Sequence, residues 1–315
     1  MPAANLQIFE NHPARTVTLD GISIRSDILF ANEKGEEKDS VEKRSTKTLQ
    51  KLSAPLRRIM RPDETVLQVM QARSPLSVLE QLTAAWWTSL LAACVIVVTN
   101  RRILFLPVKH DGSWRESVRA VNWGDLEAVK VKGLLICNVS FELRNGPKIT
   151  YMNFRRAEAK KFAAIASAMI PAASGEGTAA SGFAQLCPDC CGVLTPGKYG
   201  CPQCSLSFKN EKTMIMRSIF LPGGGYFYTG HPLIAILPAV VEIFLLLEIL
   251  LIVVAGVSQP GALQGLLGLL LIMGIFWTLE TGITILHCRR YIRNFIPDRR
   301  NSARVPQGGT PYPGV

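Results

Sequence analysis

The sequence lacks the features by which many secreted proteins and enzymes are identified. Its first 19 residues contain no basic stretch leading into an apolar core, so we expect no secretory signal peptide. There is no glycine-rich phosphate loop, and no nucleophile stands in a motif with a base. The four histidines are isolated from one another: His12, His110, His231 and His287. We therefore expect a protein that is not an enzyme.

Cysteine is scarce except in one place. Four of the eight cysteines form two C-P-x-C pairs, Cys187 with Cys190 and Cys201 with Cys204. The other four are scattered: Cys94, Cys137, Cys191 and Cys288. In a chain without a secretion signal, such pairs indicate a bound metal in a reducing compartment rather than disulfides. Four thiolates complete a tetrahedron and leave no position for water, so we predict a structural Zn²⁺ site.

Residues 186–210 resemble the short zinc ribbons of prokaryotic membrane proteins, whose pattern is C-P-x-C-G. Cys191 stands where that pattern has glycine, and it is either a substitute ligand or, as Gly192 favours, a bystander. A rubredoxin-like iron site would have a longer, aromatic-rich insert, and a redox-active C-x-x-C would occur once, at a helix start. Between the pairs, Lys198 is the only basic residue and Tyr199 the only aromatic one, so an electrostatic footprint for nucleic acid is missing.

Positive charge dominates, with 35 Lys and Arg against 24 Asp and Glu, a formal net charge of +11. Such an excess implies an anionic neighbour, either lipid head groups or nucleic acid. A dense basic group follows the last apolar stretch: Arg289, Arg290, Arg293, Arg299, Arg300 and Arg304. Beside an apolar segment, such a group is a topology signal, so lipid is the better interpretation.

Two long apolar runs, residues 233–257 and 262–286, are each long enough to cross a hydrocarbon core of ~30 Å as a helix. The turn between them is uncharged, whereas Lys209, Lys212 and Arg217 precede the first run and the arginine group follows the second. This distribution places both termini in the cytoplasm. We predict a multi-pass protein of the bacterial inner membrane, with lipids as partners.

Three carboxylates lie within these runs, at Glu242, Glu248 and Glu280. Ionisable groups inside a membrane are costly and are functional candidates. Glu242 and Glu248 differ by about 240° around a helix and cannot share a face, whereas Glu242 and Glu280 have similar depths in an antiparallel hairpin. Two roles stay open for these glutamates. They form hydrogen bonds between helices or subunits, or they take part in the passage of ions or protons.

Between residues 62 and 170 the pattern is that of short strands followed by one helix. Strands are predicted at residues 65–70, 94–99, 103–108, 118–121, 128–131, 136–143 and 148–153. Apolar residues at helical spacing then predict an amphipathic helix over residues 156–169, ended by Pro171.

These motifs resemble the bacterial pleckstrin-homology-like (PH-like) family, which is related in shape to GRAM domains. The resemblance rests on residues 62–66, on Thr99-Asn100-Arg101-Arg102-Ile103 as a hairpin, and on the turn at residues 122–126. Ahead of the first apolar run, residues 222–230 (PGGGYFYTG) resemble the two-transmembrane-helix domain family. The implied fold class is α+β multidomain: an antiparallel PH-like β-roll with a C-terminal helix, a zinc ribbon, and a transmembrane α-helical hairpin.

The expected domains follow from this order. Residues 1–60 are a flexible N-terminal region, since residues 32–45 are charged and nearly free of large apolar groups. Residues 61–171 are the PH-like domain, 172–185 a linker, 186–210 the ribbon, 214–296 the hairpin region and 297–315 a basic, disordered tail. Residues 76–93 either lie on the domain or the bilayer surface, with Trp86 and Trp87 at the interface, or form a further span.

The combination favours a non-enzymatic membrane-anchored adaptor or scaffold, which acts through a protein partner or as a homo-oligomer. Candidate contacts with lipid or a partner are Arg101, Arg102, Lys109, Lys130 and Lys132. A second hypothesis is an oligomeric small transporter or channel component that uses the intramembrane glutamates. A zinc ribbon that binds nucleic acid ranks third.

Overall fold

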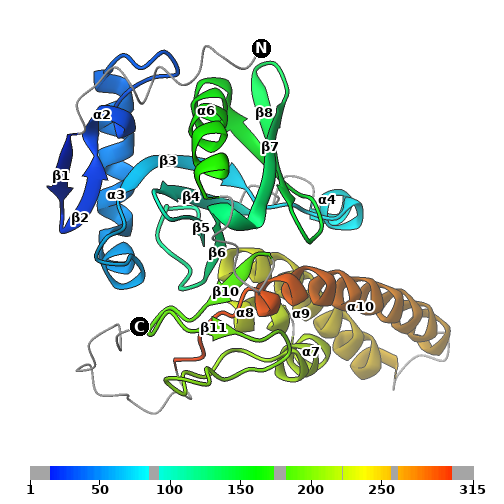
Figure 1. Cartoon of the computed structure of the whole chain (residues 1–315). Helices are drawn as coiled ribbons and strands as arrows, with labels where there is room; N and C mark the ends of the chain where they lie inside the picture. Colours follow the sequence, from blue (N-terminus) through cyan, green and yellow to red (C-terminus); the bar gives the residue numbers. More distant parts are fainter. Residues whose placement is uncertain (1–14, 85–91, 174–181, 222, 257–261, 300–315) are drawn as a thin grey trace.

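The structure is a computed structural model that describes residues 15–84, 92–173, 182–221, 223–256 and 262–299. A roll of antiparallel strands stands above a long helical hairpin (Figure 1). Its strands are β3 (Val66–Arg73), β4 (Ala93–Thr99), β5 (Arg102–Pro107), β6 (Val118–Asn122), β7 (Leu126–Lys132), β8 (Ile136–Leu143) and β9 (Ile149–Arg155). The helix α6 (Arg156–Ala172) follows β9. The strands and the helix that the sequence predicts are therefore confirmed. The prediction that Pro171 ends the helix is wrong, because α6 includes Pro171 and ends at Ala172.

The order of these strands is β6-β5-β4-β3-β9-β8-β7. The short helix η2 (Trp123–Asp125) connects β6 with β7. A first core fills the roll and includes Phe105, Phe141, Tyr151 and, from α6, Phe162. The hairpin β4–β5 contributes Ile96, Val98 and Ile103 to the same core.

A second core lies on the outer face of β3 to β6. Alternate residues of β4 and β5, Val95, Val97, Leu104 and Leu106, point into it. Both faces of these strands are thus buried, which explains their continuous apolar runs. The cover comes from the N-terminal segment: β1 (Thr16–Leu19), β2 (Ile22–Arg25), α2 (Ser26–Leu29) and α3 (Asp39–Ile59).

The prediction of a flexible N-terminal region is wrong for residues 15–59. α3 is a helix of 21 residues, and its apolar face of Leu49, Leu52, Leu56 and Ile59 is fully buried. The charges at residues 32–45 belong to the turn ahead of α3 and to its solvent face, where they need no burial. Residues 1–14 lie outside the described part of the chain.

The cysteine-rich segment of residues 186–210, called the ribbon below, adds to the sheet. β10 (Ala184–Leu186) pairs antiparallel with β6 and with β11 (Val193–Leu194). The predicted linker 172–185 is therefore shorter than expected, because α6 extends to Ala172 and residues 184 and 185 are in β10. At the other end, Asp298 donates its N–H to the Ser207 carbonyl at 2.8 Å, so the predicted disordered tail is ordered at least to Arg299.

The C-terminal part is helical: α7 (Glu211–Phe220), α8 (Gly224–Thr229), α9 (Pro232–Gly256) and α10 (Ala262–Arg293). α8 packs closely, since a Cβ at Gly224 would lie 2.1 Å from the Arg217 carbonyl oxygen of α7. Within α9 and α10, residues 232–254 and 265–293 are long and apolar enough to cross a membrane, with mean hydropathies of 2.7 and 1.9. Only 6% of each apolar window is buried, unlike the core helices of a soluble domain.

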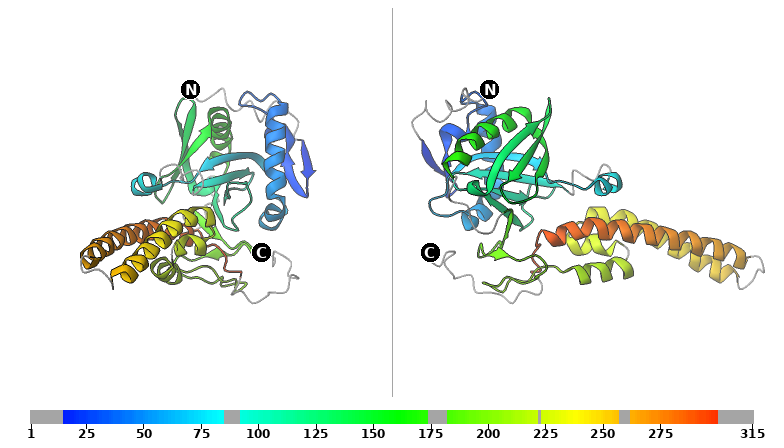
Figure 2. Two further views of the ribbon diagram at one scale, coloured as in Figure 1. Left: turned by 180° about the vertical axis from the view of Figure 1, so that it is seen from behind. Right: turned by 45° about the vertical axis from the view of Figure 1, so that its right-hand side comes forward.

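The segment between β3 and β4 contains α4 (Val78–Ala84), which projects from the roll alongside the hairpin (Figure 2). Val78 and Leu82 are each 74% exposed. Trp86 and Trp87 lie outside the described residues, so the choice between a surface helix and a span over residues 76–93 stays a prediction.

Candidate metal centre and domain junction

The two C-P-x-C turns have matching backbone geometry. Cys191 donates its N–H to the Cys187 carbonyl at 2.9 Å, and Ser205 donates to the Cys201 carbonyl at 3.0 Å. Cys191 and Ser205 both take left-handed backbone conformations, with φ of 59°. This is the conformation that favours glycine, and it is reached by a non-glycine residue at both turns.

The four predicted thiols converge on one point. Their sulfur atoms all lie within 4.8 Å of one another, and the pairs Cys187–Cys204 and Cys190–Cys201 are each 3.5 Å apart. A tetrahedron with metal–sulfur bonds of about 2.3 Å has sulfur–sulfur edges of about 3.8 Å, so the site fits a metal ion. Burial raises the pKa of the Cys190 thiol to about 12, so this thiol would ionise only beside a cation.

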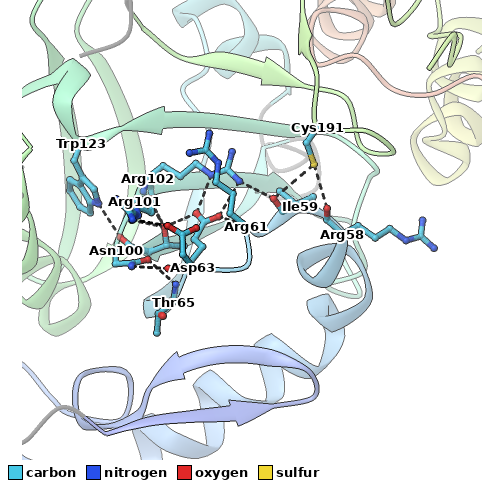
Figure 3. A network of polar contacts seen from close by, with 12 residues as sticks. Arg58, Ile59, Arg61, Asp63, Thr65, Asn100, Arg101, Arg102, Trp123 and Cys191 are labelled. Carbon is cyan, nitrogen blue, oxygen red and sulfur yellow. Dashed lines mark hydrogen bonds and ion pairs between the residues drawn. The ribbon is translucent and has the colours of Figure 1, made fainter. Parts of the chain in front are cut away.

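Cys191 stands apart from this cluster. Its sulfur lies 3.4 Å from the Arg58 carbonyl oxygen and 3.9 Å from that of Ile59, at the C-terminus of α3 (Figure 3). The last carbonyls of a helix have no partner within the helix, so a thiol donor there is favourable. Cys191 thus connects the ribbon to α3.

The same helix end is joined to the β4–β5 hairpin through Arg102, which also forms a buried ion pair with Glu64. Arg102 donates from Nε and Nη2 to the two carboxylate oxygens of Glu64, both at 3.0 Å, and from Nη2 to the Ile59 carbonyl at 2.8 Å (Figure 3). The carboxylate also accepts from the Thr99 hydroxyl at 2.8 Å and the Arg61 N–H at 3.0 Å. The Arg102 side chain is 5% exposed, and that of Glu64 0%. The prediction of Arg102 as a lipid or partner contact is therefore wrong.

The other predicted contact cations do not form one patch. Arg101, in the β4–β5 turn, pairs with Asp63, ahead of β3, at 2.6 Å. Lys130 pairs with Glu142 at 2.6 Å, on β7, whereas Lys109 follows β5. Lys132 is exposed on β7, at the opposite end of the strand order from β5 and β6.

The end of α10 joins all three parts of the chain. Arg290 donates to the Pro75 carbonyl and lies 3.7 Å from the Glu80 carboxylate of α4. The Asn294 carbonyl accepts from the Ser117 hydroxyl, just ahead of β6. Beyond α10, Arg299 bridges Glu116 of the roll at 3.1 Å and Asp189 of the first C-P-x-C turn at 2.9 Å. The roll, the ribbon and the hairpin are thus bonded to one another at a single junction.

Of the three carboxylates in the apolar helices, two lie close to each other. Glu242 is 2% exposed, and its carboxyl group lies close to that of Glu280 of α10. Glu280 in turn accepts a hydrogen bond from the Thr284 hydroxyl at 2.6 Å. Glu248 is partly exposed on α9 and takes no part in this pair within the described structure.

One polar residue that the sequence does not single out organises the other side of the roll. Lys161 of α6 is buried, and its ammonium donates to three carbonyls around the end of α2: Ile28, Leu29 (3.2 Å) and Ala31 (2.8 Å). Burial lowers the pKa of Lys161 to about 7. In the sequence, Lys161 is indistinguishable from the exposed Lys160 beside it.

One comparison with known proteins, the match to a protein family, supports the fold of the roll. Residues 60–167 match the bacterial PH domain family. Among solved structures, the chain is similar to the Vps36 N-terminal PH domain at 14% sequence identity, with a TM-score of 0.26, over 36% of this chain and 83% of that chain. No curated protein matches the chain. The chain thus has a PH-like antiparallel domain, a cysteine cluster able to hold a metal ion, and two apolar helices of membrane-spanning length.

Proposed function

We propose that the chain is a non-enzymatic adaptor anchored in the bacterial inner membrane, with both termini in the cytoplasm. Its PH-like domain presents a surface to a protein partner at the inner face of the membrane. The four cysteines bind a structural Zn²⁺, and the ribbon makes the joint between domain and hairpin rigid. One observation carries the proposal: Arg290, Asn294 and Arg299 bond the end of α10 to the roll and the ribbon.

The position of α4 supports contact with lipid. Its exposed Val78, Leu79 and Leu82 lie on a segment bonded to α10 through Glu80 and Arg290. A short apolar helix fixed beside a membrane span lies at head-group depth, where apolar side chains enter the acyl boundary. The arginines at the end of α10 would face anionic head groups.

The test is photocrosslinking of the full chain in membranes. A photoreactive residue replaces Leu135, which is 85% exposed at the β7–β8 turn, and in a control it replaces Ile243, which is exposed on α9. We expect a discrete protein adduct from Leu135 and lipid adducts or self-adducts from Ile243. If Leu135 gives no protein adduct, or if tags at the termini are labelled from the periplasm, the adaptor model fails.

A second candidate, an oligomeric transporter component, is favoured by the proximity of the carboxyl groups of Glu242 and Glu280 inside the hairpin. Proton or ion flux into vesicles that is lost in the Glu242→Gln, Glu280→Gln variant would support transport. Equal flux with the wild type, the variant and empty vesicles would support the adaptor.

A further inference from the structure

The helix α7 lies alongside α10, at the end of α10 that is nearest the roll (Figures 1 and 2). Glu211, the first residue of α7, pairs with Arg289 of α10 at 2.6 Å. Further along α7, the Ser218 carbonyl accepts from the Thr281 hydroxyl at 3.4 Å. Thr281 precedes Arg289 by eight residues, which is about 12 Å along a helix. α7 therefore runs antiparallel to α10, from its basic end toward the middle of the apolar hairpin.

After a turn, α8 runs back toward the basic end of α10. The Tyr226 hydroxyl lies 2.6 Å from Nδ1 of His287, and the Thr229 hydroxyl lies 3.4 Å from the sulfur of Cys288. Both partners on α10 are nearer to its basic end than Thr281 is. The chain thus goes in with α7 and comes back with α8 beside α10, and the longer helix α9 follows only after this return.

Glycines let the turn and the start of α8 pack against the neighbouring helices. A Cβ at Gly223, whose φ is +61°, would lie 2.6 Å from the Ala235 carbonyl oxygen of α9. A Cβ at Gly225 would lie 2.6 Å from the Thr284 side chain of α10. Because both approaches are too close for a Cβ, only glycine permits these contacts. The backbone here is therefore covered by α9 and α10.

Backbone polar groups at the turn are paired within the protein. Gly224 donates its N–H to the Leu221 carbonyl at 2.7 Å, and Phe227 donates to the Gly223 carbonyl at 3.1 Å. At membrane depth, a non-helical backbone is tolerated only where it is buried in protein or lines a water-filled cavity. The turn meets this requirement through its contacts with the protein.

The outer surface of α7 and α8 is apolar. Phe220, at the end of α7, is 66% exposed, and the next residue, Leu221, is 54% exposed. Further exposed apolar side chains are Met216, Ile219 and Phe227. This surface continues that of α9 and α10, of whose apolar windows only 6% is buried. A continuous exposed apolar surface of this kind, beside two helices of membrane-spanning length, fits the acyl chains of lipid.

Within residues 213–229, Arg217 is the only charged residue, and its side chain points back toward the start of α7. Its guanidinium lies over the Tyr228 ring, 4.9 Å from the ring centre. The Tyr228 hydroxyl in turn accepts from the N–H of Asn210, the residue just ahead of α7, at 3.1 Å. Arginine near a membrane surface reaches toward the head groups in this way, with its stem among apolar groups.

We propose that α7 and α8 form a re-entrant segment, which enters the cytoplasmic leaflet beside α10 and contacts lipid acyl chains through its exposed apolar residues. Phe220 lies nine residues beyond Glu211, so it is about 14 Å deeper than the level of Arg289. That depth is close to half of a hydrocarbon core of ~30 Å. The re-entrant segment depends on the proposed anchoring, since α10 must span the membrane for α7 to enter it. It adds a lipid contact that the two spans do not require.

The test measures membrane depth in the full chain, reconstituted in nanodiscs of phosphatidylcholine and phosphatidylglycerol. A genetically encoded keto amino acid at one position carries a nitroxide label, so all cysteines stay unmodified. Collision with oxygen, which dissolves in the membrane, and with a nickel chelate, which stays in water, gives the depth of each label. The labelled positions are Lys212, Phe220 and Phe227, which are all exposed in α7 or α8.

We expect the label at Phe220 to lie about 12 Å deeper than that at Lys212, since eight residues of helix separate them. The label at Phe227 should be shallower than that at Phe220, because α8 turns back. Equal depths at Lys212 and Phe220, as in a helix that lies flat at the head groups, would overturn the proposal. So would a label at Phe227 deeper than that at Phe220. A label at Phe220 that collides with neither reagent would also overturn it, since a partner or a second copy of the chain, and not lipid, would then cover this surface.

Two control positions separate this result from the anchoring itself. A label at Ile243, exposed on α9, reports on the span, and a label at Leu135, exposed at the β7–β8 turn, reports on the cytoplasm. If Ile243 is deep and Phe220 is not, the re-entrant segment fails and the anchoring stands. If the nickel chelate reaches Ile243 as it reaches Leu135, the anchoring itself fails. If the protein labelled at Phe220 does not fold, the adjacent exposed Leu221 takes the label instead.

Discussion

Removal of Arg102 should loosen the centre of the PH-like domain far more than removal of its neighbour Arg101. The variant Arg102→Met leaves the Glu64 carboxylate buried without its ion-pair partner and takes a donor from the Ile59 carbonyl. Breaking a buried pair in this way costs about 3–5 kcal/mol of unfolding free energy. The Arg101–Asp63 pair has side chains 49% and 55% exposed, so Arg101→Met should cost about 1 kcal/mol or less.

Native-state hydrogen exchange of the full chain in detergent measures this difference locally. The amides of β4 and β5 flank the ion pair, and their opening free energy should fall by the full amount in Arg102→Met. A double variant, Glu64→Leu with Arg102→Met, should recover part of the loss because no charge stays buried. Equal protection of β4 and β5 in Arg102→Met and Arg101→Met would refute the inference that this pair holds the hairpin to α3.

Three further predictions concern other contacts. Cys201→Ser, or a strong chelator, should release bound zinc, measured by atomic absorption, and expose the ribbon to proteolysis, whereas Cys191→Ser should keep the metal. The pKa of Lys161 is lower in the folded protein than in the unfolded chain, so the unfolded chain binds more protons between about pH 7 and pH 10. The unfolding free energy of the wild type should therefore rise over this interval, with a slope of at most about 1.4 kcal/mol per pH unit. Lys161→Met should remove that slope, as measured by thermal melts at a series of pH values. Glu242→Gln should keep the contact between α9 and α10, whereas Glu242→Leu should weaken it by about 1 kcal/mol. The measurement is crosslinking between cysteines placed on the two helices. Equal crosslinking in both variants would contradict the pairing of Glu242 with Glu280.

The strands of the roll could be predicted because their signals are local. Val98 to Phe105 shows two β-branched and aromatic runs around a tight turn, and the structure forms β4 and β5 there. The four thiols could be predicted for the same reason, since each C-P-x-C turn is set by adjacent residues. The similar depth of Glu242 and Glu280 follows from helix geometry alone.

Tertiary cover could not be predicted in the same way. The charges at residues 32–45 predict a flexible segment, although Leu49, Leu52, Leu56 and Ile59 follow at helical spacing. A second signal was present in β4, where Val95 to Val98 are apolar without alternation, which requires cover on both faces. Nothing in the sequence says that this cover comes from the N-terminus, because pairing at such separation depends on the whole fold.

The burial of Arg102 has the same cause. Two adjacent arginines in a turn are equivalent in sequence, and only the position of the α3 end separates them. Arg102 reaches the Ile59 carbonyl while Arg101 reaches solvent and Asp63. Because Cys191 contacts the same helix end from the ribbon, α3 connects the outer face of the roll to the segment that carries the four clustered cysteines.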